Sequence, residues 1–232
     1  MSKHRKNNSL TVRIDDLLQY DPITQNQKVA FDAWEDNDNL VLAGTAGTGK
    51  TFIALYMALE ELLDPKDAFF RRIVIIRSVV PTRDIGFLPG TVDEKKDMYN
   101  IPYKNICGEL FGDVGAYNKL TTARQIDFES TSFIRGSTFD DSIIIVDEMQ
   151  NLTFHELDTV ITRVGRNSKI IFCGDYKQSD FKFQDEKDGL FKFIAILEQM
   201  KNFSVIQFGW DDIVRSGLVR DYIMTKEMLG YD

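Results

Sequence analysis

The sequence predicts an α/β protein with a mostly parallel sheet and helices on both of its faces, and three observations support this prediction. Four short apolar runs are too continuous for half-exposed strands, so they are typical of strands buried in a parallel sheet. Segments with helical apolar spacing separate these runs. A glycine-rich loop joins the first run directly to a helix. The four runs are residues 40–43, 73–76, 143–146 and 170–173.

Helices are predicted where apolar residues recur at spacings of three and four between the runs. Thr153 and Glu156 match a capping box, so we expect a helix from there to about Val164. A short edge strand is predicted over residues 10–14, where apolar and polar residues alternate. The other predicted helices are residues 24–34, 51–62 and 189–200.

The length of 232 residues and an apolar content of 43% suit one large globular domain. We expect a polar N-terminal extension over residues 1–20 and a single domain over residues 21–232. Glycine and proline punctuate the region at about 81–130, where we predict an irregular insertion. An insertion of this length is expected to carry helices and a function of its own.

The net charge of -8 argues against a surface that is basic throughout, so a nucleic-acid site has to be local. Cys107 and Cys173 lack a partner at CxxC spacing and are interpreted as buried structural thiols. We find neither a secretory signal nor an apolar run of membrane-spanning length. We therefore expect a cytoplasmic protein with no membrane partner, in the host cytoplasm if the source is viral.

One segment matches the phosphate-binding pattern G-x-x-x-x-G-K-[ST], and it lies between a predicted strand and a predicted helix, as that pattern requires. Its backbone N–H groups and the helix N-terminus are expected to surround the phosphates of ATP. Lys50 is expected to bridge the β- and γ-phosphates, and the Thr51 hydroxyl to bind Mg²⁺. The segment consists of Gly44, Thr45, Ala46, Gly47, Thr48, Gly49, Lys50 and Thr51.

Two acidic residues follow the apolar run at 143–146. Because α/β sheets bind ligands at the carboxyl ends of their strands, Asp147 is a candidate to hold Mg²⁺ through water. Glu148 is the candidate general base that polarises the attacking water. An acidic pair after a strand is also typical of a cap or a solvated loop. Its combination with the glycine loop favours a hydrolytic site.

Two glutamines complete this set. Gln178 follows the run at 170–173 and is a candidate sensor of the γ-phosphate. Gln27 precedes the glycine loop and is a candidate to contact the adenine edge. On spacing alone, Gln27 fits an ordinary surface position on a helix equally well.

Together these motifs resemble the PhoH family of ATPases, which are similar to the first RecA-like domain of superfamily 1 helicases. The resemblance extends from about residue 20 to about residue 225. Thr45 and Ser78 stand where the family usually has proline and Met149 where it has alanine, but none of these departures removes a group needed for hydrolysis. The matching segments are 24–27, 44–51, 86–90, 94–95, 133–136, 146–153, 162–165, 174–180 and 212–215.

The resemblance implies Mg²⁺-dependent ATP hydrolysis coupled to binding of RNA or single-stranded DNA or to helicase-like remodelling, in a homo-oligomeric ring for which a hexamer is favoured. Superfamily 1 helicases supply an arginine from a second RecA-like domain, which is not predicted here, so a neighbouring subunit is expected to supply it. Arg163 and Arg215 are the candidates, and either also fits a sensor in cis or a surface residue. Short stand-alone forms are common in bacteriophages, and no room is predicted for the nuclease-like PIN domain of some relatives.

Arg77 and Arg135 follow strand-like segments and are candidates to contact a nucleic-acid backbone. Ion pairs with acidic residues are the alternative for both. Two other functional classes stay open. The first is an ATP-gated regulatory or scaffold protein with slow turnover. The second is a small-molecule kinase, which fits less well because Glu148 and Gln178 suit water activation.

Overall fold

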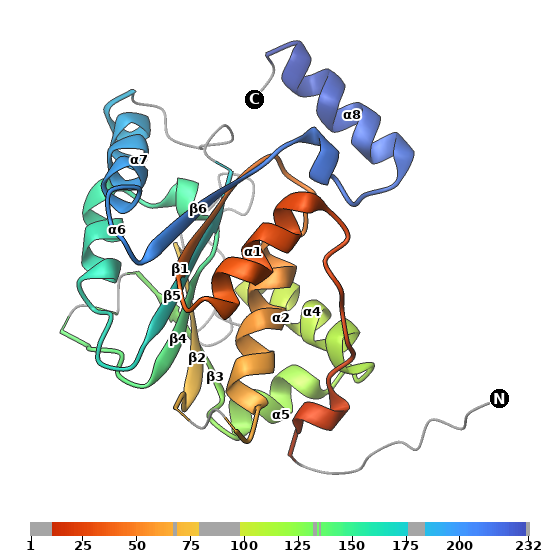
Figure 1. Cartoon of the computed structure of the whole chain (residues 1–232), viewed down its shortest axis with the longest axis vertical. Coiled ribbons are helices and arrows are strands. Elements are labelled where there is room, and N and C mark those ends of the chain that lie inside the picture. The colour runs from red at the N-terminus through yellow and green to blue at the C-terminus, as the bar shows by residue number, and fades with distance from the viewer. Residues whose placement is uncertain are drawn as a thin grey trace.

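The computed structural model describes residues 11–66, 69–78, 98–131, 134, 136–175 and 184–230. These residues form a six-stranded sheet in the order β3-β2-β4-β5-β1-β6, in which every neighbouring pair is parallel (Figure 1). The crossover connections of a parallel sheet place helices over its faces. The strands are β1 (Asn39–Gly44), β2 (Arg72–Arg77), β3 (Ile126–Ser130), β4 (Ser142–Val146), β5 (Lys169–Gly174) and β6 (Phe203–Phe208).

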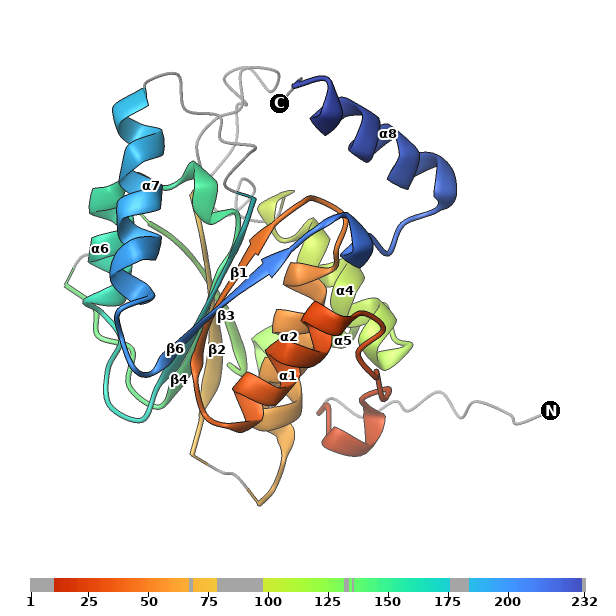
Figure 2. The ribbon, with the colours of Figure 1, turned by 45° about the horizontal axis from the view of Figure 1, so that its top comes forward.

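Helices cover both faces of this sheet. Helices α1, α2, α4 and α5 pack on one face, and α6 and α7 pack on the other (Figure 1). Helix α8 follows β6 and lies apart from both layers (Figure 2). The helices are α1 (Gln25–Glu35), α2 (Lys50–Leu63), α4 (Ile101–Phe111), α5 (Ala116–Thr122), α6 (Phe154–Ile161), α7 (Gln184–Leu197) and α8 (Gly217–Met228), with short 3-10 helices η1 (Ile14–Asp16), η2 (Met149–Asn151) and η3 (Trp210–Asp212).

The core consists of two clusters, one on each face of the sheet. On β1, Leu40 and Leu42 belong to the cluster shared with α1, α2, α4 and α5, whereas Val41 and Ala43 belong to the cluster shared with α6 and α7. This division follows the alternation of side chains along a strand. All four side chains are fully buried, which explains why the strand reads as a continuous apolar run. The predicted α/β fold is therefore confirmed.

The predicted edge strand at residues 10–14 is wrong in its described part, which begins at residue 11. Residues Ile14–Asp16 form the 3-10 helix η1. The reason is local, since the Arg13 backbone N–H donates to the Asp16 carboxylate at 3.1 Å and closes a turn. Val12 packs against the first core cluster instead of extending the sheet.

Helix α6 ends at Ile161, earlier than the predicted end near Val164. Val164 forms a parallel bridge with Phe139. The Phe139 N–H donates to the Arg163 carbonyl, and the Gly165 N–H donates to the Phe139 carbonyl, both at 2.9 Å. These bonds to the segment before β4 take the chain out of the helix.

Among the strands and α-helices of the described residues, the sequence analysis missed β3, β6 and α8. Strand β3 lies inside the region predicted as an irregular insertion, whose described part also contains α4 and α5. Both missed strands lie at the edges of the sheet. Their apolar runs are interrupted, because an edge strand is covered less completely than a central one; β3 alternates buried and half-buried positions.

Candidate nucleotide site

The glycine loop between β1 and α2 turns at residues in the left-handed region. Gly44, Gly47 and Gly49 have φ angles of 123°, 76° and 82°, which a residue with a Cβ rarely adopts. A Cβ at Gly44 would also collide with the Phe208 carbonyl oxygen at the end of β6. The Thr45 N–H donates to that same oxygen at 3.0 Å. The loop is thus held against the neighbouring strand.

Lys50 opens α2 and reaches back over this loop. Its Nζ donates to the carbonyl oxygens of Gly44 and Thr45 at 2.8 and 2.7 Å. Burial lowers the pKa of Lys50, and interaction with acidic neighbours, Asp175 first, opposes this shift. The ammonium group therefore stands inside the loop, where the sequence pattern predicts the phosphates.

The Thr51 hydroxyl and the Asp147 carboxylate meet where β4 ends. Thr51 Oγ1 donates to Asp147 Oδ1 at 2.7 Å, and Asp147 is only 4% exposed. A hydroxyl and a carboxylate are hard oxygen donors of the kind that Mg²⁺ binds in nucleotide sites, with phosphates and water completing its coordination. The chemistry of this pair fits the predicted metal site.

Tyr103 of α4 is a third member of this group. Its hydroxyl donates to Asp147 Oδ2 at 2.9 Å. Burial raises the pKa of Tyr103 well above its ordinary value, and the negative Asp147 adds to the shift, so the hydroxyl keeps its proton. Sequence reasoning missed Tyr103. A signal was available, since Tyr103, Cys107 and Leu110 have helical apolar spacing and form the buried side of α4.

Glu148 lies between two polar partners. It has a φ of 53°, a left-handed value that is uncommon for residues with a side chain. One of its carboxylate oxygens accepts from Gln150 Nε2 at 2.5 Å, and the other lies 4.0 Å from the Arg77 guanidinium. The Gln150 side chain is fixed in turn, because its Oε1 accepts from the Asp175 N–H at 3.0 Å. The carboxylate is oriented yet 39% exposed, so water can reach it.

Arg77, predicted as a nucleic-acid contact, belongs to this same cluster. Burial alone would lower the pKa of Arg77, but Tyr103, Asp147 and Glu148 outweigh burial and raise it. The Arg77 side chain is 24% exposed, so part of it remains accessible to another partner. The structure thus places Arg77 beside the candidate catalytic carboxylate.

Gln27 is buried beneath the loop rather than exposed on the surface of α1. It is 4% exposed, its Nε2 donates to the Thr48 carbonyl at 3.2 Å, and its Oε1 accepts from the Ile23 N–H at 3.0 Å. The alternative of an ordinary surface glutamine is therefore wrong. The contact to Thr48 connects α1 to the glycine loop.

The two arginines proposed for transition-state stabilisation lie in different places. Arg215 is next to the loop of its own chain, since a Cβ on Gly47 would lie 3.0 Å from Arg215 Cγ. The neighbouring Val214 N–H donates to the Gly47 carbonyl at 3.1 Å. Arg163 instead follows α6 and bonds through its backbone to Phe139, near the amino end of β4, whereas the loop lies at the carboxyl ends of the strands. Of these two arginines, only Arg215 therefore lies at the nucleotide site of its own chain.

Several predictions fall on other positions. Gln178 and Arg135 lie outside the described residues, as do the family segments at 86–90 and 94–95. Cys107 and Cys173 are buried free thiols, as predicted. Burial raises the pKa of Cys107 to about 12, which keeps its thiol protonated and unreactive.

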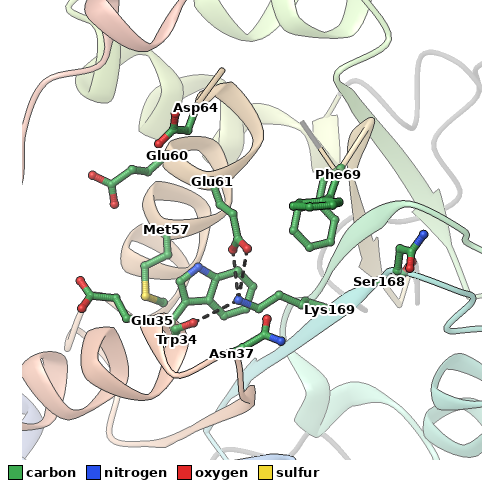
Figure 3. A pocket seen from close by; sticks show the side chains of 12 residues that line it. Trp34, Glu35, Asn37, Met57, Glu60, Glu61, Asp64, Phe69, Ser168 and Lys169 are labelled. Carbon is green, nitrogen blue, oxygen red and sulfur yellow. Dashed lines mark hydrogen bonds and ion pairs between the residues drawn. The ribbon is translucent and has the colours of Figure 1, made fainter. Parts of the chain in front are cut away.

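A separate pocket of about 660 Å³ lies away from the loop, near the amino ends of β1 and β5 (Figure 3). Lys169 enters it and donates to the Trp34 carbonyl at 3.1 Å and to Glu61 at 3.2 Å, with Nζ 3.5 Å from the Trp34 ring centroid. The excess of carboxylates would repel phosphate, so this pocket does not suit a nucleotide. The remaining acidic residues of its lining are Glu35, Glu60 and Asp64.

The glycine loop joins a strand to a helix and lies beside the acidic residues that follow β4 of the parallel sheet. This arrangement defines a RecA-like P-loop NTPase fold. The chain belongs to the PhoH-like protein family, whose model matches residues 19–226. It is 34% identical over 203 residues to the PhoH-like protein of Mycobacterium leprae, covering 87% of this chain and 57% of that one. It is 32% identical over 188 residues to the protein PhoH of Escherichia coli, covering 80% and 52%.

The chain thus spans a little over half the length of these two relatives. Among solved structures, the large terminase of a thermophilic bacteriophage has a similar fold, with a TM-score of 0.50 and 12% identity over 90% of this chain and 50% of that one. At this identity the similarity concerns the fold alone. No helix within the described residues is both long and apolar enough to cross a membrane.

Proposed function

We propose that this chain hydrolyses ATP with Mg²⁺ and couples hydrolysis to binding of RNA or single-stranded DNA. The observation that carries the proposal is the 2.7 Å hydrogen bond from the Thr51 hydroxyl to Asp147, which joins the phosphate loop to the end of β4. A glycine loop by itself only binds phosphate. The oxygen pair suited to Mg²⁺, followed directly by Glu148, adds what hydrolysis requires.

In the proposed reaction, the water oxygen attacks the γ-phosphorus while the bond from that phosphorus to the β,γ-bridging oxygen breaks, releasing ADP and phosphate. Glu148 takes the proton of the water. Lys50 and the N–H groups of the loop stabilise the charge on the phosphate oxygens. Thr51 and Asp147 would hold Mg²⁺, which when bound neutralises phosphate charge and orients the leaving group.

The surroundings of Glu148 support its role as the base. Gln150 bonds to it and to the backbone of Asp175, so the base is linked to the end of β5. The chain from this strand leads to Gln178, which we assign as the γ-phosphate sensor. Gln27, buried against Thr48, is assigned to the adenine side of the loop.

An arginine is still needed against the charge that develops in the transition state. The position of Arg215 beside Gly47 supports a role in cis. Arg163 lies near the amino ends of the strands, away from the loop, so it would act only on a neighbouring subunit. The assembly would then be a homo-oligomeric ring, of which a hexamer is the favoured form. Helix α8 supports such an assembly, because Leu218, Tyr222 and Met228 expose 83%, 68% and 71% of their surface.

Nucleic-acid binding is assigned to the side of the molecule where β2 ends. Arg77 is partly accessible there and lies 4.0 Å from Glu148. A nucleic-acid phosphate bound at Arg77 would therefore be connected to the hydrolytic site by a single side chain. Arg135 is the second candidate for this contact. We place the protein in the cytoplasm, where ATP and nucleic acid are both available.

The test is phosphate release measured with ATP and Mg²⁺, with and without RNA or single-stranded DNA, while the oligomeric mass is recorded in the same buffer. Release that rises several-fold with nucleic acid is the expected result. ATP binding with no stimulated release would favour the ATP-gated scaffold instead. Phosphate that appears on a small acceptor, with free phosphate at background, would make the chain a kinase.

A further inference from the structure

We propose that Tyr103 is a positioning residue for the metal-dependent reaction, and that its hydroxyl holds Asp147 in the orientation that serves Mg²⁺ together with Thr51. This inference rests on the proposed function, and it assigns a role to a residue outside the phosphate loop and the acidic motif. It also connects α4, from the region between β2 and β3, with the centre of the site.

The Asp147 carboxylate is held on both oxygens. Oδ1 accepts from Thr51 at 2.7 Å and Oδ2 accepts from Tyr103 at 2.9 Å. The terminal torsion of an aspartate is broad, so one hydrogen bond alone leaves the plane of the carboxylate free to turn. The second bond fixes that plane. Orientation matters for Mg²⁺ in particular, because this ion demands near-ideal octahedral geometry.

Tyr103 is itself immobilised by the core. It is 1% exposed, and its ring lies 6.0 Å from the ring of Phe128 on β3. A ring packed in this way restricts the directions in which its hydroxyl donates, and Asp147 accepts from it. Bonds of this kind, from a neighbour to a metal-binding carboxylate, are known to raise metal affinity about 10- to 100-fold.

Tyr103 also connects the two carboxylates of the site. The Arg77 guanidinium interacts with the Tyr103 hydroxyl and opposes the rise in the pKa of Tyr103, and the same guanidinium lies 4.0 Å from Glu148. The group that orients the metal-side carboxylate therefore interacts with the arginine beside the candidate base.

The experiment compares Tyr103→Phe with the matched control Tyr56→Phe. Tyr56 is also buried and also donates to a carboxylate, that of Glu60 at 3.0 Å, but both residues belong to α2 and neither is part of the candidate site. Binding of a fluorescent ATP analogue is titrated in EDTA and at increasing Mg²⁺. For Tyr103→Phe we expect a rise of about tenfold in the Mg²⁺ concentration that gives half of the maximal gain in affinity for the ATP analogue. The affinity of this variant in EDTA should stay within about twofold of the wild-type value. The control should leave both quantities unchanged.

A mutant cycle tests whether the effect passes through Asp147. In an Asp147→Ala background, adding Tyr103→Phe should not alter the Mg²⁺ dependence further, whereas a general packing defect would. Thermal unfolding is recorded for each variant. An unchanged Mg²⁺ requirement in Tyr103→Phe would overturn the proposal. Loss of folding in Tyr103→Phe, while Tyr56→Phe folds, would overturn it as well, because Tyr103 would then be only a core residue.

The two proposals fail in different ways. A wild-type chain that binds ATP more tightly with Mg²⁺ but releases no phosphate would contradict hydrolysis, while the binding titration would still decide the role of Tyr103. A wild-type chain whose ATP affinity gains nothing from Mg²⁺ would contradict the role of Tyr103.

Discussion

The Thr51 hydroxyl donates a hydrogen bond to Asp147 across 96 positions of sequence, at 2.7 Å. Thr51 lies in the first turn of α2, which follows β1, and Asp147 directly follows β4, two strands away from β1 in the sheet. Because the strands are parallel, both residues lie at the carboxyl ends of the strands. This contact turns a phosphate-binding loop into a candidate hydrolytic site.

Replacing Glu148 by Gln should lower ATP turnover by about two orders of magnitude or more, because the amide cannot take the proton of the attacking water. Affinity for ATP with Mg²⁺ should stay within a fewfold of the wild type. Steady-state phosphate release and a binding titration measure the two effects. Glu198→Gln, at an exposed position after α7, is the control. Normal turnover in Glu148→Gln would remove this residue from the mechanism.

Replacing Lys50 by Ala should weaken nucleotide binding and turnover together, because the ammonium group that stands within the loop contacts phosphate in the bound and the reacting states alike. Calorimetric titration with ATP and phosphate release are the measurements. Lys28→Ala, at an exposed position of α1, should change neither. Tight ATP binding by Lys50→Ala would show that the loop does not hold the phosphates as we propose.

The two arginine assignments predict different behaviour when subunits are mixed. If Arg163 acts on a neighbour, Glu148→Gln and Arg163→Ala subunits together should regain part of the activity that each lacks. If Arg215 acts in cis, Glu148→Gln and Arg215→Ala subunits should not, because no site then holds both groups. Native mass spectrometry in ATP checks the assembly, and only monomers there would contradict a site shared between subunits.

Replacing Gly44 by Ala should destabilise the protein by about 2 kcal/mol or more, since alanine is strained at this backbone angle and its Cβ would meet the Phe208 carbonyl. Urea unfolding measures the change. Gly209→Ala is the matched control, because a Cβ there meets nothing within 4 Å. Equal stabilities for the two variants would mean that the loop relaxes without cost.

Asp212 should stabilise the fold in a pH-dependent way. Burial alone would raise its pKa, but hydrogen bonds from Asn26, Thr24 and Gly209 lower it below the ordinary value of 3.8. A lowered pKa contributes stability above the unfolded-state value, and this contribution is lost as pH falls through the folded-state value. The stability difference between wild type and Asp212→Asn should therefore be constant near neutral pH and shrink below about pH 4. Urea unfolding of the two proteins, followed from neutral to acidic pH, measures this difference.

The central elements of the fold were predictable because their signals are local. Strands β1, β2, β4 and β5 are covered on both faces, so each one is a continuous apolar run. The edge strands β3 and β6 have interrupted runs and were missed. The η1 turn was mistaken for a strand because a two-residue alternation does not reveal the carboxylate of Asp16 that closes the turn.

The sequence by itself determined the phosphate loop, the acidic pair and the family to which they belong, because spacing within a strand–loop–helix segment sets local geometry. Only the tertiary structure decided which distant groups meet there. It brought Tyr103 to Asp147 and Arg77 to Glu148. It also placed Arg215 at the loop and Arg163 near the amino ends of the strands, away from the loop. Such contacts depend on strand order and on helix packing over the sheet, and neither leaves a periodic signal in the chain.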